Sequence, residues 1–125
     1  MKHAISSQQA PAAIGPYSQA IRTGNMLFVS GQLPIDPLTG AFPSEDIKEQ
    51  TRQSLENIRA ILTEAGFAFS DIIKTTVLLA DISDFQAMNE VYAAFFSAPY
   101  PARAAFEVGN LPKNAKVEIE VIAVK

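Results

Sequence analysis

The chain has 125 residues, a net charge of −3 and 48% hydrophobic residues, which suits a single folded domain over residues 1–125 and argues against disorder. It contains no cysteine and only one histidine, His3. The side chains needed for disulfides, thiolate catalysis, a zinc site or a Ser-His-Asp triad are therefore missing, and we expect no metal or cofactor. No apolar run approaches the roughly 20 residues that cross a bilayer, so we expect a cytoplasmic protein with no membrane contact. No cluster of Lys and Arg indicates phosphate binding, so nucleic acid is disfavoured as a partner.

Apolar runs broken by turn residues predict a hairpin in the N-terminal part of the chain. Residues 17–22 and 26–30 have strand-like composition and flank Thr23-Gly24-Asn25, a short loop that contains glycine. A Ser-Gly pair at 30 and 31 ends the second strand, and there is room for one more short strand before Gly15.

A long helix is predicted next from a start signal, a periodic stripe and a stop signal. Asp46 with Glu49 resembles a capping box, and Gly66 is a natural C-terminal stop. The apolar and small positions between them recur at steps of three and four, as one buried face requires: Ile47, Thr51, Leu55, Ile58, Leu62 and Ala65. The β-branched run at 72–79 then predicts a strand.

A second helix follows this strand. Ser83 and Gln86 give another capping signal, and the helix must end near Pro99 and Pro101. Its apolar stripe is Phe85, Met88, Tyr92 and Phe95.

The last 25 residues predict two strands joined as a hairpin. Gly, Pro and Asn residues at 109–115 separate a run that contains Arg103 from a run that contains Glu118 and Glu120. The two carboxylates alternate along the strand, so they share one face, which continues with apolar side chains. A cation and a carboxylate in a partly apolar setting suit the binding of a small carboxylate and the handling of a proton. The simpler interpretation is a structural ion pair and a solvated strand face.

These elements give an α+β fold in which two helices cover one face of a mixed sheet. Residues 26–29 and 77–79 are apolar on both faces of their strands, and the chain offers no second helical layer. We therefore expect a second copy of the protein to cover the other face of the sheet, and so an oligomer.

Several motifs occur together in order along the chain. They are Ala-Ile-Gly-Pro-Tyr-Ser at 13–18, Val-Ser-Gly-Gln at 29–32, Pro-Ala-Arg at 101–103, Leu-Pro at 111–112 and Val-Glu-Ile-Glu at 117–120. With these motifs the chain resembles the RidA (YjgF) family of imine deaminases over essentially its whole length. The resemblance implies a chorismate-mutase-like fold, a homotrimer, and three sites in clefts between subunits.

The resemblance also implies an activity and a set of site residues. The activity is that of a 2-iminobutanoate/2-iminopropanoate deaminase, which hydrolyses reactive enamines and imines to 2-keto acids and ammonia. Arg103 matches the residue that holds the substrate carboxylate, and Glu118 matches the residue that positions the water. Further matches line the cleft: Tyr17, Ser30, Gly31, Asn89 and Pro112. Ala105 stands where many relatives have cysteine, so the cleft should differ in size there.

Other interpretations remain open for these residues. Tyr17 can cap the sheet, the Ser-Gly pair can be a strand-ending turn, Asn89 can be an exposed polar residue, and Lys74 is treated as structural. A non-catalytic sensor of small 2-keto or amino acids would need Arg103 but not Glu118. A third alternative, an endoribonuclease or translation inhibitor, is disfavoured by the acidic balance and by the lack of a catalytic histidine.

Overall fold

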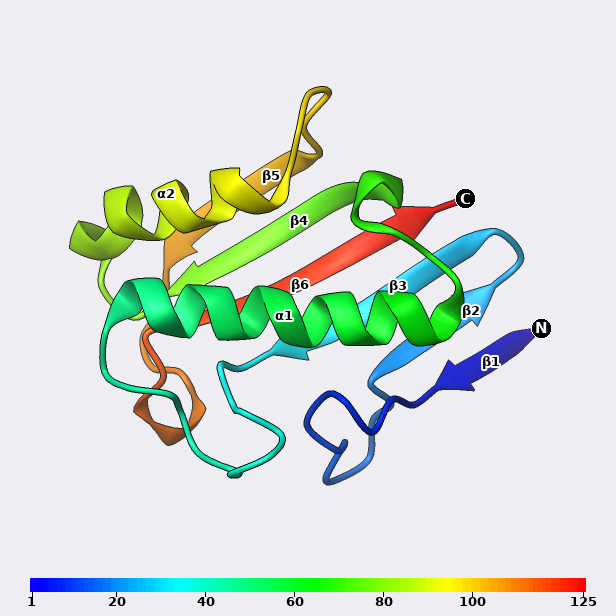
Figure 1. Cartoon of the computed structure of the whole chain (residues 1–125), viewed down its shortest axis with the longest axis horizontal. Coiled ribbons are helices and arrows are strands. Elements are labelled where there is room, and N and C mark those ends of the chain that lie inside the picture. Colours follow the sequence, from blue (N-terminus) through cyan, green and yellow to red (C-terminus); the bar gives the residue numbers. More distant parts are fainter.

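The computed structural model describes residues 1–125 and is built on a six-stranded sheet with the order β1-β2-β3-β6-β4-β5 (Figure 1). The strands are β1 (Lys2–Ile5), β2 (Ala20–Thr23), β3 (Met26–Gln32), β4 (Ile72–Leu79), β5 (Ala102–Glu107) and β6 (Val117–Val124). The helices are α1 (Ile47–Ala65) and α2 (Phe85–Phe95), with short 3-10 turns η1 (Phe69–Asp71), η2 (Ile82–Asp84) and η3 (Pro112–Asn114). Strands β4 and β5 are parallel and the other neighbours antiparallel, which confirms the mixed sheet.

The predicted N-terminal hairpin is present, although its first strand is shorter than expected. Strand β2 begins at Ala20 and pairs with β3 across a turn in which Gly24 has a φ of 57°. The additional strand before Gly15 is β1, which pairs with β2 at one edge of the sheet. The opposite edge is β5.

Helix α1 begins and ends where the sequence indicates. The Asp46 carboxylate accepts a hydrogen bond from the Glu49 N–H at 3.3 Å, as an N-cap should. The Glu49 carboxylate does not return the bond; it accepts instead from the Ser44 hydroxyl at 2.9 Å. Gly66 ends the helix with a φ of 80°, a left-handed conformation that glycine adopts without strain.

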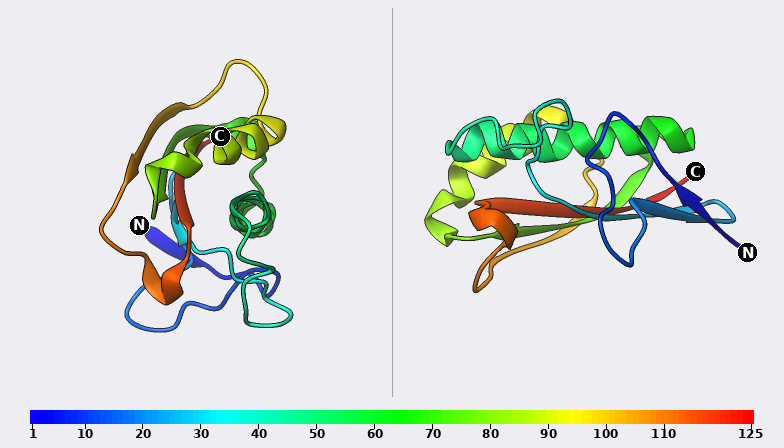
Figure 2. Two further views of the ribbon diagram at one scale, coloured as in Figure 1. Left: turned by 90° about the vertical axis from the view of Figure 1, so that its left-hand side faces the viewer. Right: turned by 90° about the horizontal axis from the view of Figure 1, so that it is seen from below.

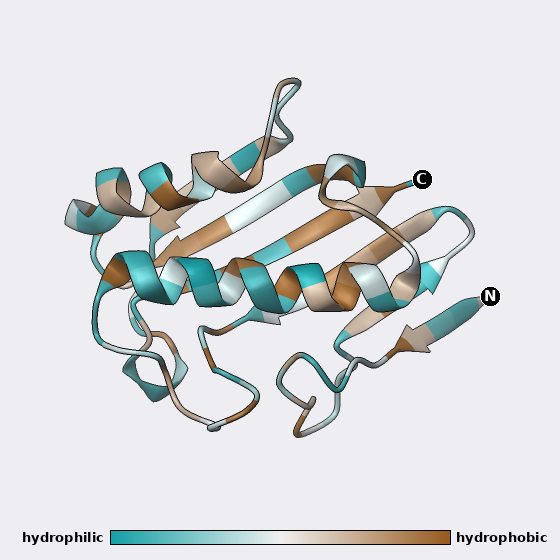
Figure 3. Ribbon diagram, viewed as in Figure 1, coloured by the Kyte–Doolittle hydropathy of each residue, from teal (hydrophilic) through white to brown (hydrophobic).

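Both helices lie on the same face of the sheet, as Figure 2 shows edge-on, and this confirms the predicted layering. In Figure 3, α1 crosses the central strands, which contain brown, hydrophobic segments. The apolar stripe of α1 and these strands belong to one buried core. Fully buried side chains in this layer include Leu55, Ile58, Leu62, Val77, Leu79, Val117 and Ile119. Each large aliphatic side chain buried there stabilises the fold by roughly 1.5–3 kcal/mol. None of the helices combines the length and apolarity needed to cross a membrane.

Two predictions about local structure are wrong. The last two strands do not form a hairpin, because β6 inserts between β3 and β4 while β5 adds to the far side of β4. Ser83 does not cap α2: it lies within η2, and its own N–H and hydroxyl donate to the Asp81 carboxylate. Helix α2 begins directly after this turn without a side-chain cap.

Candidate functional site

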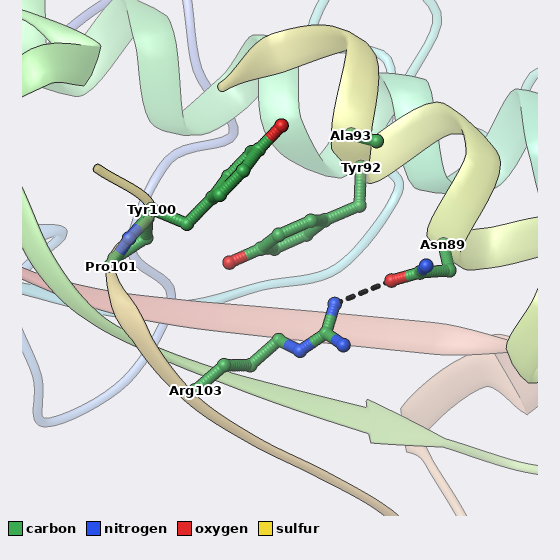
Figure 4. Close-up of a pocket in the computed structure, with 6 residues that line it drawn as sticks. All are labelled: Asn89, Tyr92, Ala93, Tyr100, Pro101 and Arg103. Atoms are coloured by element: carbon green, nitrogen blue, oxygen red, sulfur yellow. Dashed lines mark hydrogen bonds between the residues drawn. The ribbon is translucent and has the colours of Figure 1, made fainter. Parts of the chain in front are cut away.

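Arg103 forms one wall of a cavity of about 480 Å³ between β5 and α2. Figure 4 shows its guanidinium reaching from the edge strand toward α2, where it donates a hydrogen bond to the Asn89 side-chain oxygen at 2.7 Å. We call this cavity the arginine half-site, and its lining residues are Asn89, Tyr92, Ala93, Tyr100, Pro101 and Arg103.

Aromatic rings of α2 hold the guanidinium of Arg103. Its central carbon lies 4.7 Å from the centre of the Tyr92 ring and 5.4 Å from the centre of the Phe85 ring. Both distances are within the range of cation–π attraction. The two ion pairs of the chain, Lys48–Glu90 and Arg59–Glu56, do not involve Arg103. The Arg103 guanidinium is therefore oriented by aromatic contacts but has no carboxylate partner in its own chain.

Glu118 lies on β6 beside a bulge in β3. Val29 pairs with Val121 and Gln32 with Ile119, so two residues of β3 oppose a single residue of β6. One of the two is Gly31. A Cβ atom added there would stand 2.6 Å from a carboxylate oxygen of Glu118, so the missing side chain of Gly31 makes room for this carboxylate. Bulges of this kind often occur beside functional sites.

The electrostatic setting of Glu118 favours its protonated form. The side chain is half-buried, and burial raises the pKa of its carboxyl, to which the nearby charge of Glu120 adds. No cation forms an ion pair with it. A carboxylate whose pKa is raised is a stronger proton acceptor than an ordinary surface glutamate.

Two further residues singled out in the sequence, Tyr17 and Ser30, lie near Gly31, and a third, Pro112, directly precedes a residue of the same groove. Tyr17, 54% exposed, lines a groove of about 270 Å³ together with Gly31 and Lys113, the residue after Pro112. The Ser30 hydroxyl donates to the Ser18 carbonyl oxygen at 2.6 Å, so it also fixes the loop that carries Tyr17. We call this region, with Glu118, the glutamate half-site.

The two half-sites lie on opposite faces of the sheet. Arg103 pairs in register with Thr75 of β4, and Glu118 pairs with Leu78 of the same strand. Paired residues share a face, whereas Thr75 and Leu78, three residues apart, point to opposite faces. Arg103 is therefore on the helix-covered side and Glu118 on the helix-free side, and a single chain does not bring them together.

Two aromatic contacts of Arg103 in the arginine half-site are not predicted from the sequence. Phe85 and Tyr92 were assigned only to the apolar stripe of the second helix, yet both rings contact Arg103. Their spacing carried a usable signal, because Phe85, Asn89 and Tyr92 follow at four and then three residues and so share one helix face. Lys113 was also missed; it has a φ of 59°, which is uncommon for a residue other than glycine.

Comparisons with known proteins agree with these observations. The family model described as "Endoribonuclease L-PSP" matches residues 7–125. A RutC family protein of Pyrococcus horikoshii is 58% identical over 125 residues, covering 100% of this chain and 99% of that protein. The 2-iminobutanoate/2-iminopropanoate deaminase of Salmonella typhimurium is 51% identical over 128 positions, covering 100% and 99%. The crystal structure of Escherichia coli TdcF with bound serine is 49% identical, covers 98% of each chain and has a TM-score of 0.94.

Proposed function

This chain belongs to the RidA family, whose family model carries the description Endoribonuclease L-PSP, and we propose that it is a 2-iminobutanoate/2-iminopropanoate deaminase. It would hydrolyse reactive enamines and imines of small amino acids to 2-keto acids and ammonia. The Salmonella relative with this name aligns along the whole chain at 51% identity. The proposed substrate class is thus a small 2-imino carboxylate.

The observation that supports this proposal most strongly is the unpaired, oriented Arg103. Its guanidinium lies against two aromatic rings, is hydrogen-bonded to Asn89 and has no protein carboxylate to neutralise it. A planar guanidinium presents two parallel N–H groups to a carboxylate, which fixes the angle of the ligand as well as its charge. The E. coli relative with serine bound supports a small amino-acid-like ligand.

Glu118 is the proposed base for the attacking water. As the water oxygen bonds to the imine carbon, Glu118 accepts a proton from it and then returns this proton to the nitrogen. This gives a carbinolamine, in which the former imine carbon carries a hydroxyl and an amino group. Glu118 then takes the proton of this hydroxyl and passes it to the amino group; the carbon–nitrogen bond breaks as the carbonyl forms, ammonia leaves and a 2-keto acid remains. General base catalysis contributes roughly 10²–10⁴-fold, and the raised pKa of Glu118 suits this role at neutral pH.

A homotrimer with clefts between subunits would complete the site. The arginine half-site and the glutamate half-site face away from each other within one chain, so each needs a complement from another chain. Contacts between unlike surfaces form a closed ring when the rotation from one subunit to the next closes, and the family resemblance implies a ring of three subunits. Exposed aromatic side chains on the helix-free face are a further argument for assembly. The exposed fractions of Phe28 and Phe106 on this face are 41% and 47%.

The experiment that tests this function couples a threonine dehydratase to the protein and measures the release of 2-ketobutyrate. We expect wild type to accelerate release, Arg103→Ala to abolish the effect, and Glu118→Gln to slow turnover while calorimetric binding of 2-ketobutyrate persists. Failure of the wild type to accelerate release would refute the deaminase function. Wild-type binding without acceleration would favour the second candidate, a non-catalytic sensor of small carboxylates, for which the serine-bound relative is the motive.

We propose no ribonuclease role in spite of the description of the family model. The net charge of −3 does not attract phosphates, and His3, an exposed residue of the edge strand β1, has no acid–base partner that pairs with it. RNA cleavage that co-purifies with the wild type and is lost in a point variant would overturn this statement.

A further inference from the structure

A pair of buried hydroxyl groups includes the hydroxyl of the tyrosine ring against which the guanidinium of Arg103 lies. The hydroxyls of Thr75 on β4 and Tyr92 on α2 share a hydrogen bond of 2.8 Å. Thr75 is fully buried and Tyr92 is 5% exposed, so water does not compete for this bond. The pair joins the sheet to the helix within the core, next to the wall of the arginine half-site.

The register of the sheet places this pair where it can act on Arg103. Thr75 and Arg103 are Cα partners on the parallel strands β4 and β5, and both face α2. Tyr92 reaches across both of them: its hydroxyl meets Thr75, and its ring lies 4.7 Å from the guanidinium carbon (Figure 4). The hydrogen bond at one end of the tyrosine therefore fixes the tilt of the ring at which Arg103 stacks.

The chemistry of the pair suits a fixed, uncharged support. Burial is the largest influence on Tyr92 and raises the pKa of its phenol, outweighing the opposing effects of the Thr75 hydrogen bond and of the charge and hydrogen bonding of the Arg103 side chain. The phenol therefore stays protonated at neutral pH, and the pair carries no charge there. Arg103 itself is exposed and would otherwise be free to rotate about its long side chain.

We propose that Thr75 and Tyr92 are positioning residues, which hold the guanidinium plane of Arg103 in the orientation that receives the substrate carboxylate. This inference rests on the proposed function. Phe85 and Asn89 limit the guanidinium from the remaining sides, through the ring at 5.4 Å and the hydrogen bond at 2.7 Å. Thr75 differs from them because it does not line the half-site and acts on Arg103 only through Tyr92.

The test uses full-length variants and two readouts, steady-state turnover of the dehydratase-generated imine and calorimetric affinity for 2-ketobutyrate. Thr75→Val removes one hydroxyl at nearly constant shape. We expect its KM and its dissociation constant for 2-ketobutyrate to rise roughly three- to tenfold, the range of a weakened cation–π contact, with kcat within about twofold of wild type. Thr75→Ser keeps a hydroxyl and should restore most of the affinity.

The double variant Thr75→Val with Tyr92→Phe separates positioning from stability. Removing both hydroxyls leaves no unpaired polar group, so it should melt closer to wild type than Thr75→Val does. Its KM should nevertheless stay raised, because the hydrogen bond that fixes the tilt of the ring is lost. This variant also supplies the measurement if Thr75→Val alone does not fold.

Thr51→Val is the matched control, because Thr51 is equally buried and its hydroxyl donates to the Ile47 carbonyl oxygen within α1, outside both half-sites. It should lower stability without changing KM. Three results would each overturn this inference without touching the proposed function. They are an unchanged KM in the double variant, a rise in KM in Thr51→Val equal to that in Thr75→Val, and no recovery of affinity in Thr75→Ser. Wild-type affinity for 2-ketobutyrate in Arg103→Ala would overturn the carboxylate role of Arg103, and this inference with it.

Discussion

Replacing Gly31 with alanine tests the glutamate half-site with the smallest possible change. The new Cβ atom would lie 2.6 Å from a carboxylate oxygen and 2.9 Å from the carboxyl carbon of Glu118. Ordinary contact begins at about 3.4 Å, so the carboxylate must retreat by about 0.8 Å. The atoms that must move are the end of a flexible side chain rather than backbone, so the strain can be relieved by rotation of Glu118.

The expected effects on stability and on activity differ widely. A shifted side chain costs about 0.5–1.5 kcal/mol, and alanine returns about 0.4–1 kcal/mol by restricting the unfolded chain where φ permits it. Gly31 is not among the glycines with positive φ, so the net change in unfolding free energy should be within about 1 kcal/mol. A misplacement of about 1 Å in a catalytic group can cost roughly 10²-fold in rate. We therefore expect a folded protein with about a hundredth of wild-type turnover.

The assay is 2-ketobutyrate release beside a thermal melt. Gly109→Ala is the matched control, since Gly109 also lacks a positive φ and its Cβ would meet nothing within 4 Å. It should keep both stability and turnover. Full turnover in a folded Gly31→Ala would refute the placement of Glu118 as the base, and unfolding would refute the claim that its side chain can yield.

Four other substitutions follow from the same structure. Arg103→Lys should raise KM about tenfold or more because lysine cannot present the parallel N–H pair; wild-type kinetics would argue against two-point binding. Glu120→Gln removes a charge that raises the pKa of Glu118, so the acid limb of kcat/KM against pH should move to lower pH; an unmoved limb would mean that the coupling is negligible. The pKa of Glu118 is higher in the folded than in the unfolded protein, so ionisation of Glu118 lowers the stability of the fold as pH rises. Glu118→Gln should therefore melt at a higher temperature than wild type at neutral pH, and this gain should vanish in acid, where Glu118 is protonated in the folded and the unfolded protein alike. Phe28→Lys should break the assembly, so light scattering should find wild type near three times the mass of one chain and the variant near one; an unchanged mass would place the interface elsewhere.

The helices and most strand positions could be predicted because their signals are local. Asp46 and Gly66 delimit α1 through backbone hydrogen bonds and a left-handed φ, both of which depend on a few neighbouring residues. The failed hairpin shows the limit of such signals. Turn residues at 109–115 join β5 to β6 in sequence, but β4 lies between them in space, and only long-range pairing decides this.

The candidate site divides in the same way. Arg103 and Glu118 could be singled out by residue type and motif, but their opposite faces follow from registers with Thr75 and Leu78 that no local pattern states. Tyr92 looked like a core residue and is one, with a second contact on its outer side. The periodicity of apolar residues predicts which face of a helix is buried. It does not predict which side chains from other elements, such as Arg103, contact the edge of that face.

The position of Arg103 and Glu118 on opposite faces of one sheet has a genetic consequence. If each site contains the arginine of one chain and the glutamate of the next, two inactive alleles can complement each other. Chains carrying Arg103→Ala and chains carrying Glu118→Gln, co-expressed in equal amounts, would assemble at random. About a quarter of the clefts would then combine the intact arginine of one parent with the intact glutamate of the other. The same two changes placed in a single allele would leave nothing to be rescued, whatever its assembly.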